Sequence, residues 1–579
     1  MATTSLNDLP DEIILSILTC GTPTSAVALA QASRKFHIIA TTPLLWRLYC
    51  RNYFNYWDER HCIREKFVLP VSRVNWKEIY KTRHLIDVNV TENLESILAS
   101  QTGRIEKFHK ILNFGYDAKD TLLRHAAVGS EHEDYLARRY YSNAILGCLH
   151  RSIAIPKWSR LRSGEDVSLE CALAAFDMFV LETGGGDLTD ILQRLDDIVA
   201  QIVADCPAIH NLSPRQTALI IAEYLQDKSL TGIDPGQEYY NIEHNFLGIA
   251  LRNDRHNSLP LISAAIYCFV AKRRLQDGRQ GAPMYMDPFR SIQETPIAEL
   301  RSQLNFLGAL SLSQSTFLRE SLTSEIVLRC GKNILKSVTQ IPRSRCTSLD
   351  IVNAKYAGLW SSMLFSDYVT LEGSMAGAVQ GQRRPAGNIQ LRRHLPSLME
   401  HFSTDFPFDV YLVEKYLVPL FHGLPEYDHL RGIIHVMKAS DAIPKQIRRR
   451  TSEHMNVKYR VGQVFRHRRY DYLAVITGWD PECGAEEQWL QQMGIDRLRA
   501  GRHQSFYHVF VPSPDADILG QRVEDKSVRY VAEENIERIE LEISQIPQQF
   551  LKFLGQHFKR WDPITQTFVS NIKDEYPDD

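Results

Sequence analysis

Residues 9–18 read LPDEIILSIL, and residues 43–47 read PLLWR. In the first stretch apolar residues recur every three or four positions, which predicts the apolar face of a helix. Pro10 suits the start of a helix, and the two acidic residues after it favour the positive end of the helix dipole. Residues 5–54 are therefore expected to form a small helical unit, in which Ser25 caps the second helix.

A unit of this size buries little surface by itself, so its apolar excess favours contact with a partner. The combination LPDEIILSIL…LAQASRKFHIIATTPLLWRLYC resembles the F-box family. The resemblance implies docking onto the adaptor of an SCF-type ubiquitin ligase, and through it onto the cullin scaffold. The residues that it implicates in adaptor binding are Leu9, Pro10, Ile13, Ile14, Leu45 and Trp46. Cys20-Gly21 departs from the family pattern, which usually has an aromatic or apolar pair there.

Length and composition favour several domains in a cytoplasmic or nuclear protein. The 579 residues exceed the size of one hydrophobic core, and 67 Lys+Arg against 69 Asp+Glu leave no global field for nucleic acid. The longest apolar run, Pro260–Ala271, is too short for a membrane span and predicts a buried helix. The ten cysteines show no spacing suited to zinc, so we expect no metal, cofactor or membrane contact.

The central residues 131–300 are mostly helical by pattern, and Gly184-Gly185-Gly186 predicts a turn between two helices. The stretch YYNIEHNFLGIALRNDRHNSLPLISAAIYCFVAKRRL, followed by MYMDPFRS, resembles the divergent transglutaminase-like superfamily. That resemblance places Ser263 at the nucleophile position and Asp287 at the acid position.

A catalytic role for this region lacks a base. QDGRQGAP, between Leu275 and Met284, contains no histidine, and an activated serine needs one within hydrogen-bond reach. Ser263 and Asp287 are thus only weak catalytic candidates, and we expect a degenerate, non-catalytic domain. Cys268 is expected to be a small buried side chain.

The next segment, residues 301–450, returns to helix around a loop at residues 372–388, and the helical linker at 55–130 precedes the central domain. After Arg448-Arg449-Arg450 the character changes, because VGQVF, YLAVITGW, FYHVFV and VRYVA indicate short strands. One helical insertion, AEEQWLQQMGI, interrupts them.

The C-terminal residues 456–540 resemble the small β-barrel family first described as hemimethylated-DNA-binding. VGQVFRHRRYDY, GWDPEC, FYHV and YVAEENI carry this resemblance. The segment holds 12 Lys+Arg and 14 Asp+Glu, whereas a DNA-binding domain is expected to be basic. A possible nucleic-acid patch is the cluster Arg466, His467, Arg468 and Arg469. The alternative, a solvated hairpin whose arginines pair with acids such as Asp471, is preferred.

Two further features close the chain. Asp480, Glu482, Cys483 and His508 suggest a metal site by residue type, but they fall on separate elements without ligand spacing. The acidic tail, residues 560–579, is expected to be flexible and to serve as a short recognition segment.

The predicted fold is multidomain and mainly α: an F-box, a degenerate transglutaminase-like domain within a helical body, and a small C-terminal β-barrel. The predicted function is that of a non-catalytic receptor, which links the SCF adaptor to an unidentified protein substrate. Two alternatives stay open, namely a DNA- or chromatin-binding protein and a transglutaminase-like amide-processing enzyme.

Overall fold

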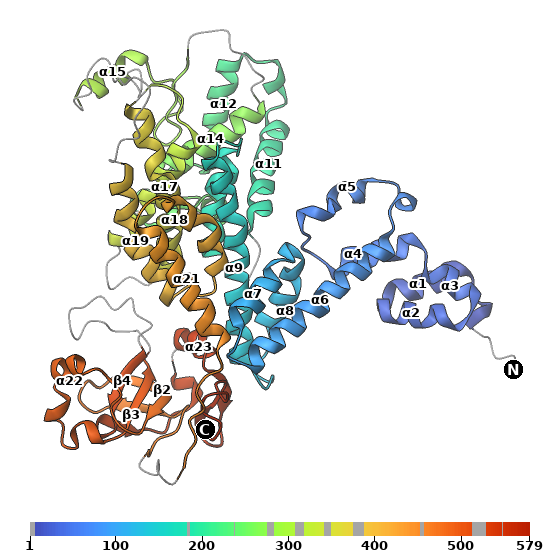
Figure 1. Ribbon diagram of the computed structural model, residues 1–579. Coiled ribbons are helices and arrows are strands. Elements are labelled where there is room, and N and C mark those ends of the chain that lie inside the picture. Colours follow the sequence, from blue (N-terminus) through green and yellow to red (C-terminus); the bar gives the residue numbers. More distant parts are fainter. Residues whose placement is uncertain are drawn as a thin grey trace. The chain divides into compact units, whose positions relative to one another are not determined.

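The computed structural model describes residues 6–181, 186–236, 238–274, 283–306, 318–340, 349–374, 387–451, 457–511, 528–546 and 548–579. It divides into two compact units, one made of residues 1–149 and 436–579 and the other of residues 150–435. The prediction of a mainly helical, multidomain chain with a small antiparallel β domain near its C-terminus is confirmed (Figure 1). The boundaries of the six segments predicted from the sequence stay a prediction.

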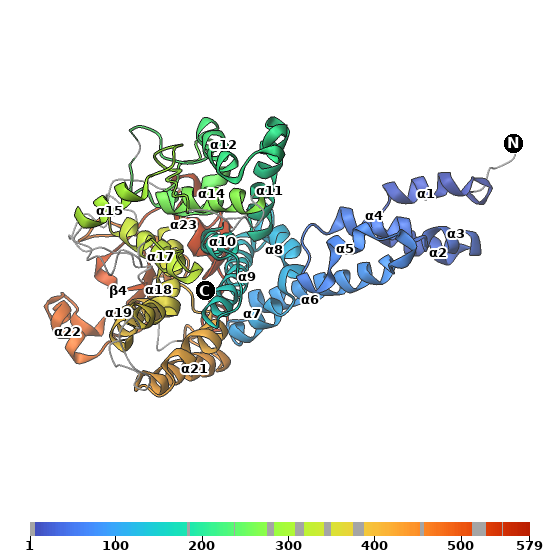
Figure 2. The ribbon, with the colours of Figure 1, turned by 90° about the horizontal axis from the view of Figure 1, so that it is seen from above.

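Four helices begin the first unit: α1 (Asp11–Cys20), α2 (Pro23–Ala32), α3 (Arg34–Ala40) and α4 (Pro43–Tyr53). Helix α1 starts one residue after Pro10. Thr22, and not Ser25 as expected, caps α2, because its hydroxyl accepts a hydrogen bond from the Ser25 N–H at 3.1 Å. The three shorter helices α1, α2 and α3 lie together in both ribbon views (Figure 2).

The first unit continues with further helices and short 3₁₀ turns. They are η2 (Glu59–His61), α5 (Ile63–Val68), α6 (Trp76–Ala99), α7 (Arg104–Leu112), η4 (Gly115–Ala118), α8 (Lys119–Ala126) and the start of α9 (Tyr135–Arg162). Helix α6 packs against α4, α7 and α8. It therefore connects the four N-terminal helices to the rest of the unit.

The second unit is helical in its described residues. Its helices are α10 (Leu169–Val180), α11 (Leu188–Asp205), α12 (Pro214–Asp227), α13 (Leu247–Arg252), α14 (Pro260–Arg274), α15 (Ile297–Phe306), α17 (Thr323–Gln340), α18 (Ile351–Ser374), α19 (Gly387–Thr404), α20 (Val410–Leu412) and the start of α21 (Glu426–Ala442). Helices α17, α18 and α19 pack side by side (Figures 1 and 2).

Several predictions concern this second unit. Helix α10 ends at Val180 and α11 begins at Leu188, but Gly184 and Gly185, on which the predicted turn falls, lie outside the described residues. Most of the predicted loop 372–388 also lies outside them, and α18 and α19 are assigned up to its two ends. The apolar run from Pro260 falls within α14, and within the described ranges no helix is both long and apolar enough to cross a bilayer.

The β domain belongs to the first unit. Its strands β1 (Val464–His467), β2 (Leu473–Asp480), β3 (Phe506–Phe510), β4 (Val528–Ala532) and β5 (Ile536–Arg538) form an antiparallel sheet in the order β4-β3-β2-β1-β5. The predicted helical insertion is α22 (Glu487–Met493). Buried side chains of β1, β2 and β3, including Phe465, Trp479 and Tyr507, form the core together with Tyr135 from α9.

The prediction that residues 560–579 form a flexible tail is wrong. Helix α23 (Gln548–Leu554) leads into a hairpin of β6 (Phe558–Asp562) and β7 (Thr567–Ser570), and a bridge joins Gln463 to Thr567. Beyond the hairpin, Ile572 and Tyr576 are buried in the core of the β domain. Two apolar anchors within an otherwise acidic segment explain why its charge alone misled the prediction.

Candidate functional site

The N-terminal helices leave several large apolar side chains in solvent. Ile13 on α1 is 48% exposed and Leu44 on α4 is 54% exposed, and Ile17, Val27 and Ile38 are also exposed. Ile13 and Ile17 are four residues apart and therefore lie on the same face of α1. Exposed apolar side chains at this density are typical of a surface that another protein covers.

The adaptor-binding residues predicted from sequence divide into two groups. Pro10 and Ile13 are exposed and Leu9 is half-buried. Ile14, Leu45 and Trp46, in contrast, are buried in the core of the four helices.

The buried tryptophan has a clear structural role. The Trp46 Nε1–H donates to the Ala40 carbonyl at 2.7 Å, and its ring meets that of Tyr49 edge-on. Any contribution of Trp46 to partner binding therefore acts through the shape of the surface that it supports.

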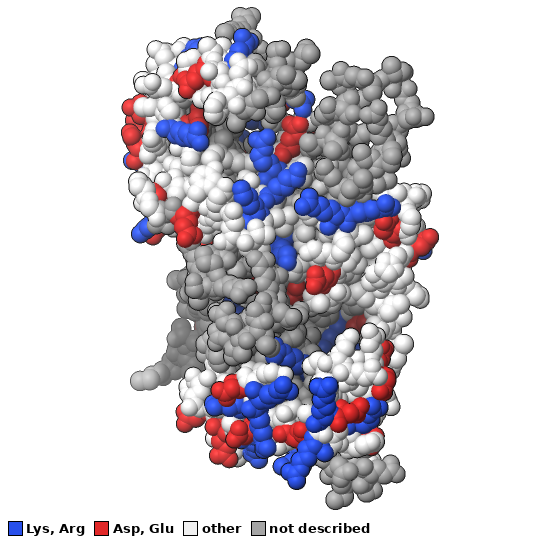
Figure 3. Space-filling view, turned by 90° about the vertical axis from the view of Figure 1, so that its left-hand side faces the viewer, with Lys and Arg blue, Asp and Glu red and all other residues white. Residues whose placement is uncertain are grey.

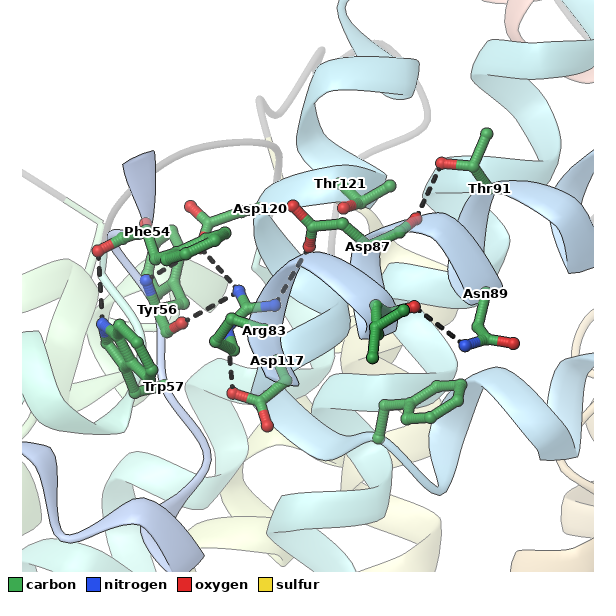
Figure 4. A network of polar contacts seen from close by, with 12 residues as sticks. Phe54, Tyr56, Trp57, Arg83, Asp87, Asn89, Thr91, Asp117, Asp120 and Thr121 are labelled. Carbon is green, nitrogen blue, oxygen red and sulfur yellow. Dashed lines mark hydrogen bonds and ion pairs between the residues drawn. The ribbon is translucent and has the colours of Figure 1, made fainter. Parts of the chain in front are cut away.

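A buried ion cluster follows the fourth helix (Figure 4). The Arg83 guanidinium, on α6, has no solvent exposure and contacts Asp87 at 3.0 Å, Asp117 at 3.2 Å and Asp120 at 3.2 Å. It also lies 4.5 Å from the centroid of the Phe54 ring. Buried charges are stable only when they are paired and hydrogen-bonded, as here.

The same carboxylates hold the chain that leaves α4. Asp120 accepts hydrogen bonds from the backbone N–H groups of Asn55 and Tyr56, and Asp117 accepts one from Asp58. His61 Nε2 lies 2.6 Å from Asp117 Oδ2. Residues 54–61 are thereby fixed to α6, η4 and α8, and we call this arrangement the Arg83 junction.

The candidate nucleophile Ser263 is buried and hydrogen-bonded. It lies on α14 with no solvent exposure, and its hydroxyl accepts from the Gly232 N–H at 3.1 Å and pairs with the Ser258 hydroxyl at 2.7 Å. Asp287 lies in a turn, where its carboxylate accepts from the Phe289 N–H. Within the described ranges the Ser263 hydroxyl contacts Gly232 and Ser258 rather than a histidine or a carboxylate, so Ser263 and Asp287 stay untested candidates.

The prediction for Cys268 is wrong. It was expected to be buried, but it is exposed on α14. The helix has buried residues on most sides, and Cys268 occupies its outward-facing position.

The basic cluster of the β domain is only partly a surface patch. Arg466, Arg468 and Arg469 are exposed, and Arg466 lies 3.5 Å from Asp471 as the preferred alternative expected. His467 is buried, and its Nδ1 accepts from the N–H groups of Arg469 and Tyr470. Burial lowers the pKa of His467 to about 4, so it carries no charge for a phosphate at neutral pH.

The surface charge around this domain is mixed. On the face in Figure 3, Lys and Arg side chains alternate with Asp and Glu side chains over the lower part of the surface. A single-sign basic field, which phosphate binding needs, is not present on that face. This agrees with the nearly balanced composition of residues 456–540.

Two of the four suspected metal residues, Asp480 and His508, belong to a polar cluster instead. Asp480 accepts from His508 at 3.1 Å and from the Tyr530 hydroxyl at 2.8 Å, and it pairs with Arg448. Burial opposes ionisation of Asp480, but these three partners outweigh it and lower its pKa to about 2. Among the described residues no group of His, Cys, Asp or Glu could hold a metal ion.

Comparison with known proteins identifies both ends of the chain. Residues 6–52, which span helices α1 to α4, match the F-box-like family. This chain carries an F-box. Residues 457–564 match the family described as hemimethylated DNA-binding protein YccV like, so the five-stranded sheet is a YccV-like domain.

Two other proteins are similar to this chain over most of its length. F-box only protein 21 of Homo sapiens is 22% identical over 615 residues, which cover 96% of this chain and 90% of that protein. F-box only protein 21 of Mus musculus is 22% identical with the same coverage. No solved structure matches the chain significantly. Both matched family models lie outside residues 131–300, so the transglutaminase-like resemblance is not confirmed.

The sequence analysis did not predict the buried ion pairs of the Arg83 junction. Its position directly after the F-box indicates that it sets how the F-box continues into the helices beyond. A signal was available, because the buried face of α6 includes Trp76, Tyr80, Arg83, Val90 and Leu94, at successive spacings of four, three, seven and four residues. A charged residue in register with an apolar face predicts a buried ion pair.

Proposed function

We propose that the protein is the substrate-recognition subunit of an SCF-type ubiquitin ligase. The observation that supports this most directly is the F-box, whose exposed apolar side chains Ile13, Ile17 and Leu44 are available to an adaptor. Adaptor binding would connect the chain to the cullin scaffold, and the remaining domains would hold a protein substrate. Ubiquitin transfer would then follow from proximity, without bond chemistry by this chain.

The Arg83 junction supports this role for a physical reason. A flexible connection after the F-box would let a bound substrate sample many positions and would lower its effective concentration near the ubiquitin-charged enzyme. Instead, Asp117 and Asp120 hold the backbone of residues 54–58 by several hydrogen bonds. We infer that these bonds restrict the movement of residues 54–58 relative to η4 and α8.

The test is capture of the adaptor by the full-length chain. Ile13→Ala/Ile17→Ala/Leu44→Ala removes exposed side chains only, so the F-box should stay folded while adaptor and cullin recovery falls by about 10-fold or more. The matched control is Leu85→Ala/Val88→Ala, which truncates exposed apolar side chains on α6, outside the F-box. Equal recovery of the adaptor by the triple variant and the control would refute the proposal.

A further inference from the structure

Residues 575–579 pack against residues 448–450 and the end of β2 in the YccV-like domain, and we call these contacted residues the Arg450 surface. The backbone N–H of Arg448 donates to the Glu575 carbonyl at 2.7 Å. The Trp479 N–H, on β2, donates to the Tyr576 hydroxyl at 3.3 Å. Residues 448–450 and 575–579 both lie outside the range 457–564 that the YccV-like family matches.

The two aspartates at the end of this segment meet a prearranged set of donors. Asp579 accepts from Arg450 Nε at 2.7 Å and from the Trp479 indole N–H at 2.8 Å, and its side chain is 1% exposed. Asp578 accepts from the Arg450 backbone N–H at 2.9 Å. Charge-assisted hydrogen bonds of this kind are among the strongest that a surface offers to a carboxylate.

The arginine that receives Asp579 is held in place by the domain itself. Arg450 Nη1 and Nη2 donate to the carbonyls of Val457 and Tyr459 at 2.9 and 2.7 Å, and its guanidinium lies 5.4 Å from the Trp479 ring centroid. Nε, which those two carbonyls do not use, donates to the Asp579 carboxylate. A guanidinium fixed by two carbonyls loses little side-chain freedom when a carboxylate binds.

The Arg450 surface also contacts an aromatic side chain, that of Tyr576. Tyr576 is 3% exposed, and its ring lies 5.7 Å from that of Trp479. A Cβ atom at Gly478 would lie only 2.5 Å from the Tyr576 hydroxyl, so the glycine makes room for the phenol. A buried aromatic side chain followed by two hydrogen-bonded carboxylates resembles the way a bound peptide is anchored.

We propose that the Arg450 surface is a peptide-binding site for acidic segments with an aromatic anchor, of the form Tyr-Pro-Asp-Asp, and that the chain's own residues 575–579 cover it in cis. This rests on the proposed receptor function, because the competing ligand would be an acidic segment of a substrate. A tethered segment has an effective concentration of about 1 mM, so a competing segment must bind tightly or be multivalent to displace it. Substrates without such a segment would be rejected.

The test uses the full-length chain and a fluorescein-labelled peptide with the sequence of residues 572–579. Tyr576→Ala/Asp578→Asn/Asp579→Asn releases the occupying segment, and this released-tail variant should bind the peptide at least about 10-fold more tightly than the parent chain does. Adding Arg450→Met, or replacing both peptide aspartates by asparagine, should abolish binding. The matched control Asp471→Asn/Glu540→Gln removes two acidic charges elsewhere in the region and should bind like the parent chain.

A second measurement needs no variant. Hydrogen exchange of the parent chain at millimolar unlabelled peptide should rise at residues 572–579, because the peptide displaces them. No peptide binding by a folded released-tail variant, together with unchanged exchange in the parent chain, would mean that the segment only stabilises the domain and would overturn the proposal. Adaptor capture by the released-tail variant is expected to stay normal, so failure of this site and failure of the receptor function give different results.

Discussion

Nη2 of Arg83 lies 3.2 Å from Oδ2 of Asp120, with the arginine side chain fully buried and the carboxylate nearly so. These two residues come from helices α6 and α8, and Asp120 also holds the backbone that leaves the F-box. Burial raises the pKa of Asp120 even though hydrogen bonds from Tyr56 and Asn55 and the charge of Arg83 oppose the rise. The carboxylate therefore depends on these partners to stay ionised.

Replacing Arg83 should be among the most damaging single changes in the first unit. Arg83→Ala leaves Asp117 and Asp120 buried without their cation, which costs about 3–5 kcal/mol. We expect a large fall in the thermal midpoint of the full-length chain, measured by differential scanning calorimetry. Lys81→Ala, on the same helix, removes only an exposed pair with Glu78 and should change the midpoint little. Similar effects of the two variants would contradict the junction.

Substitutions in the core of the F-box should reduce its folding stability more than substitutions on its surface. Trp46→Ala removes a fully packed side chain and its hydrogen bond to Ala40, so it should destabilise the F-box by about 3–5 kcal/mol. Ile13→Ala truncates a half-exposed side chain and should cost less than about 1 kcal/mol. Limited proteolysis within residues 6–52 would report this difference. A Trp46→Ala chain that resists protease like the parent would show that the core is assigned wrongly.

Ser263 should affect stability and not chemistry. Ser263→Ala leaves the Gly232 N–H and the Ser258 hydroxyl without their partner, which costs about 1–3 kcal/mol. Its exposed neighbour on the same helix provides the control, because Cys268→Ala should leave the thermal midpoint almost unchanged. Covalent labelling of Ser263 by a serine-directed electrophile would instead support the enzyme hypothesis.

The stability of the YccV-like domain should depend on pH through His467. Its pKa of about 4 in the folded chain lies below the ordinary value of 6.5, so the unfolded chain binds more protons between these two values. Stability should therefore fall as the pH drops from 6.5 to 4. His467→Asn keeps an acceptor near the position of Nδ1 and cannot be protonated, so it should flatten this part of the profile.

His503→Asn is the control for that experiment, because its side chain is largely exposed. Urea denaturation at several pH values gives the comparison. Burial also lowers the pKa of His557 to about 4, so some dependence on pH should survive in the His467→Asn chain. An unchanged slope in that variant would contradict the neutral, buried state of His467.

The sequence by itself determined both end domains, because their patterns are local. The three- and four-residue spacing after Pro10 predicts α1, and the alternating β-branched and aromatic residues of YLAVITGW predict β2. Short-range periodicity records which face of an element is buried, so it survives without knowledge of the partner. It could not say that Trp46 lies in the core while Leu44, two residues earlier, lies in solvent.

Tertiary structure alone decided the features that join distant segments. Arg83 meets carboxylates more than thirty positions later, and Arg450 meets Asp579 from the other end of the β domain. From their neighbours in sequence, Asp120, Arg450 and Asp579 would be taken for solvated surface charges, because charged side chains are exposed unless a partner compensates them. Only the folded chain brings the opposite charges within hydrogen-bond distance, and it thereby turns a predicted loose tail into a bound segment.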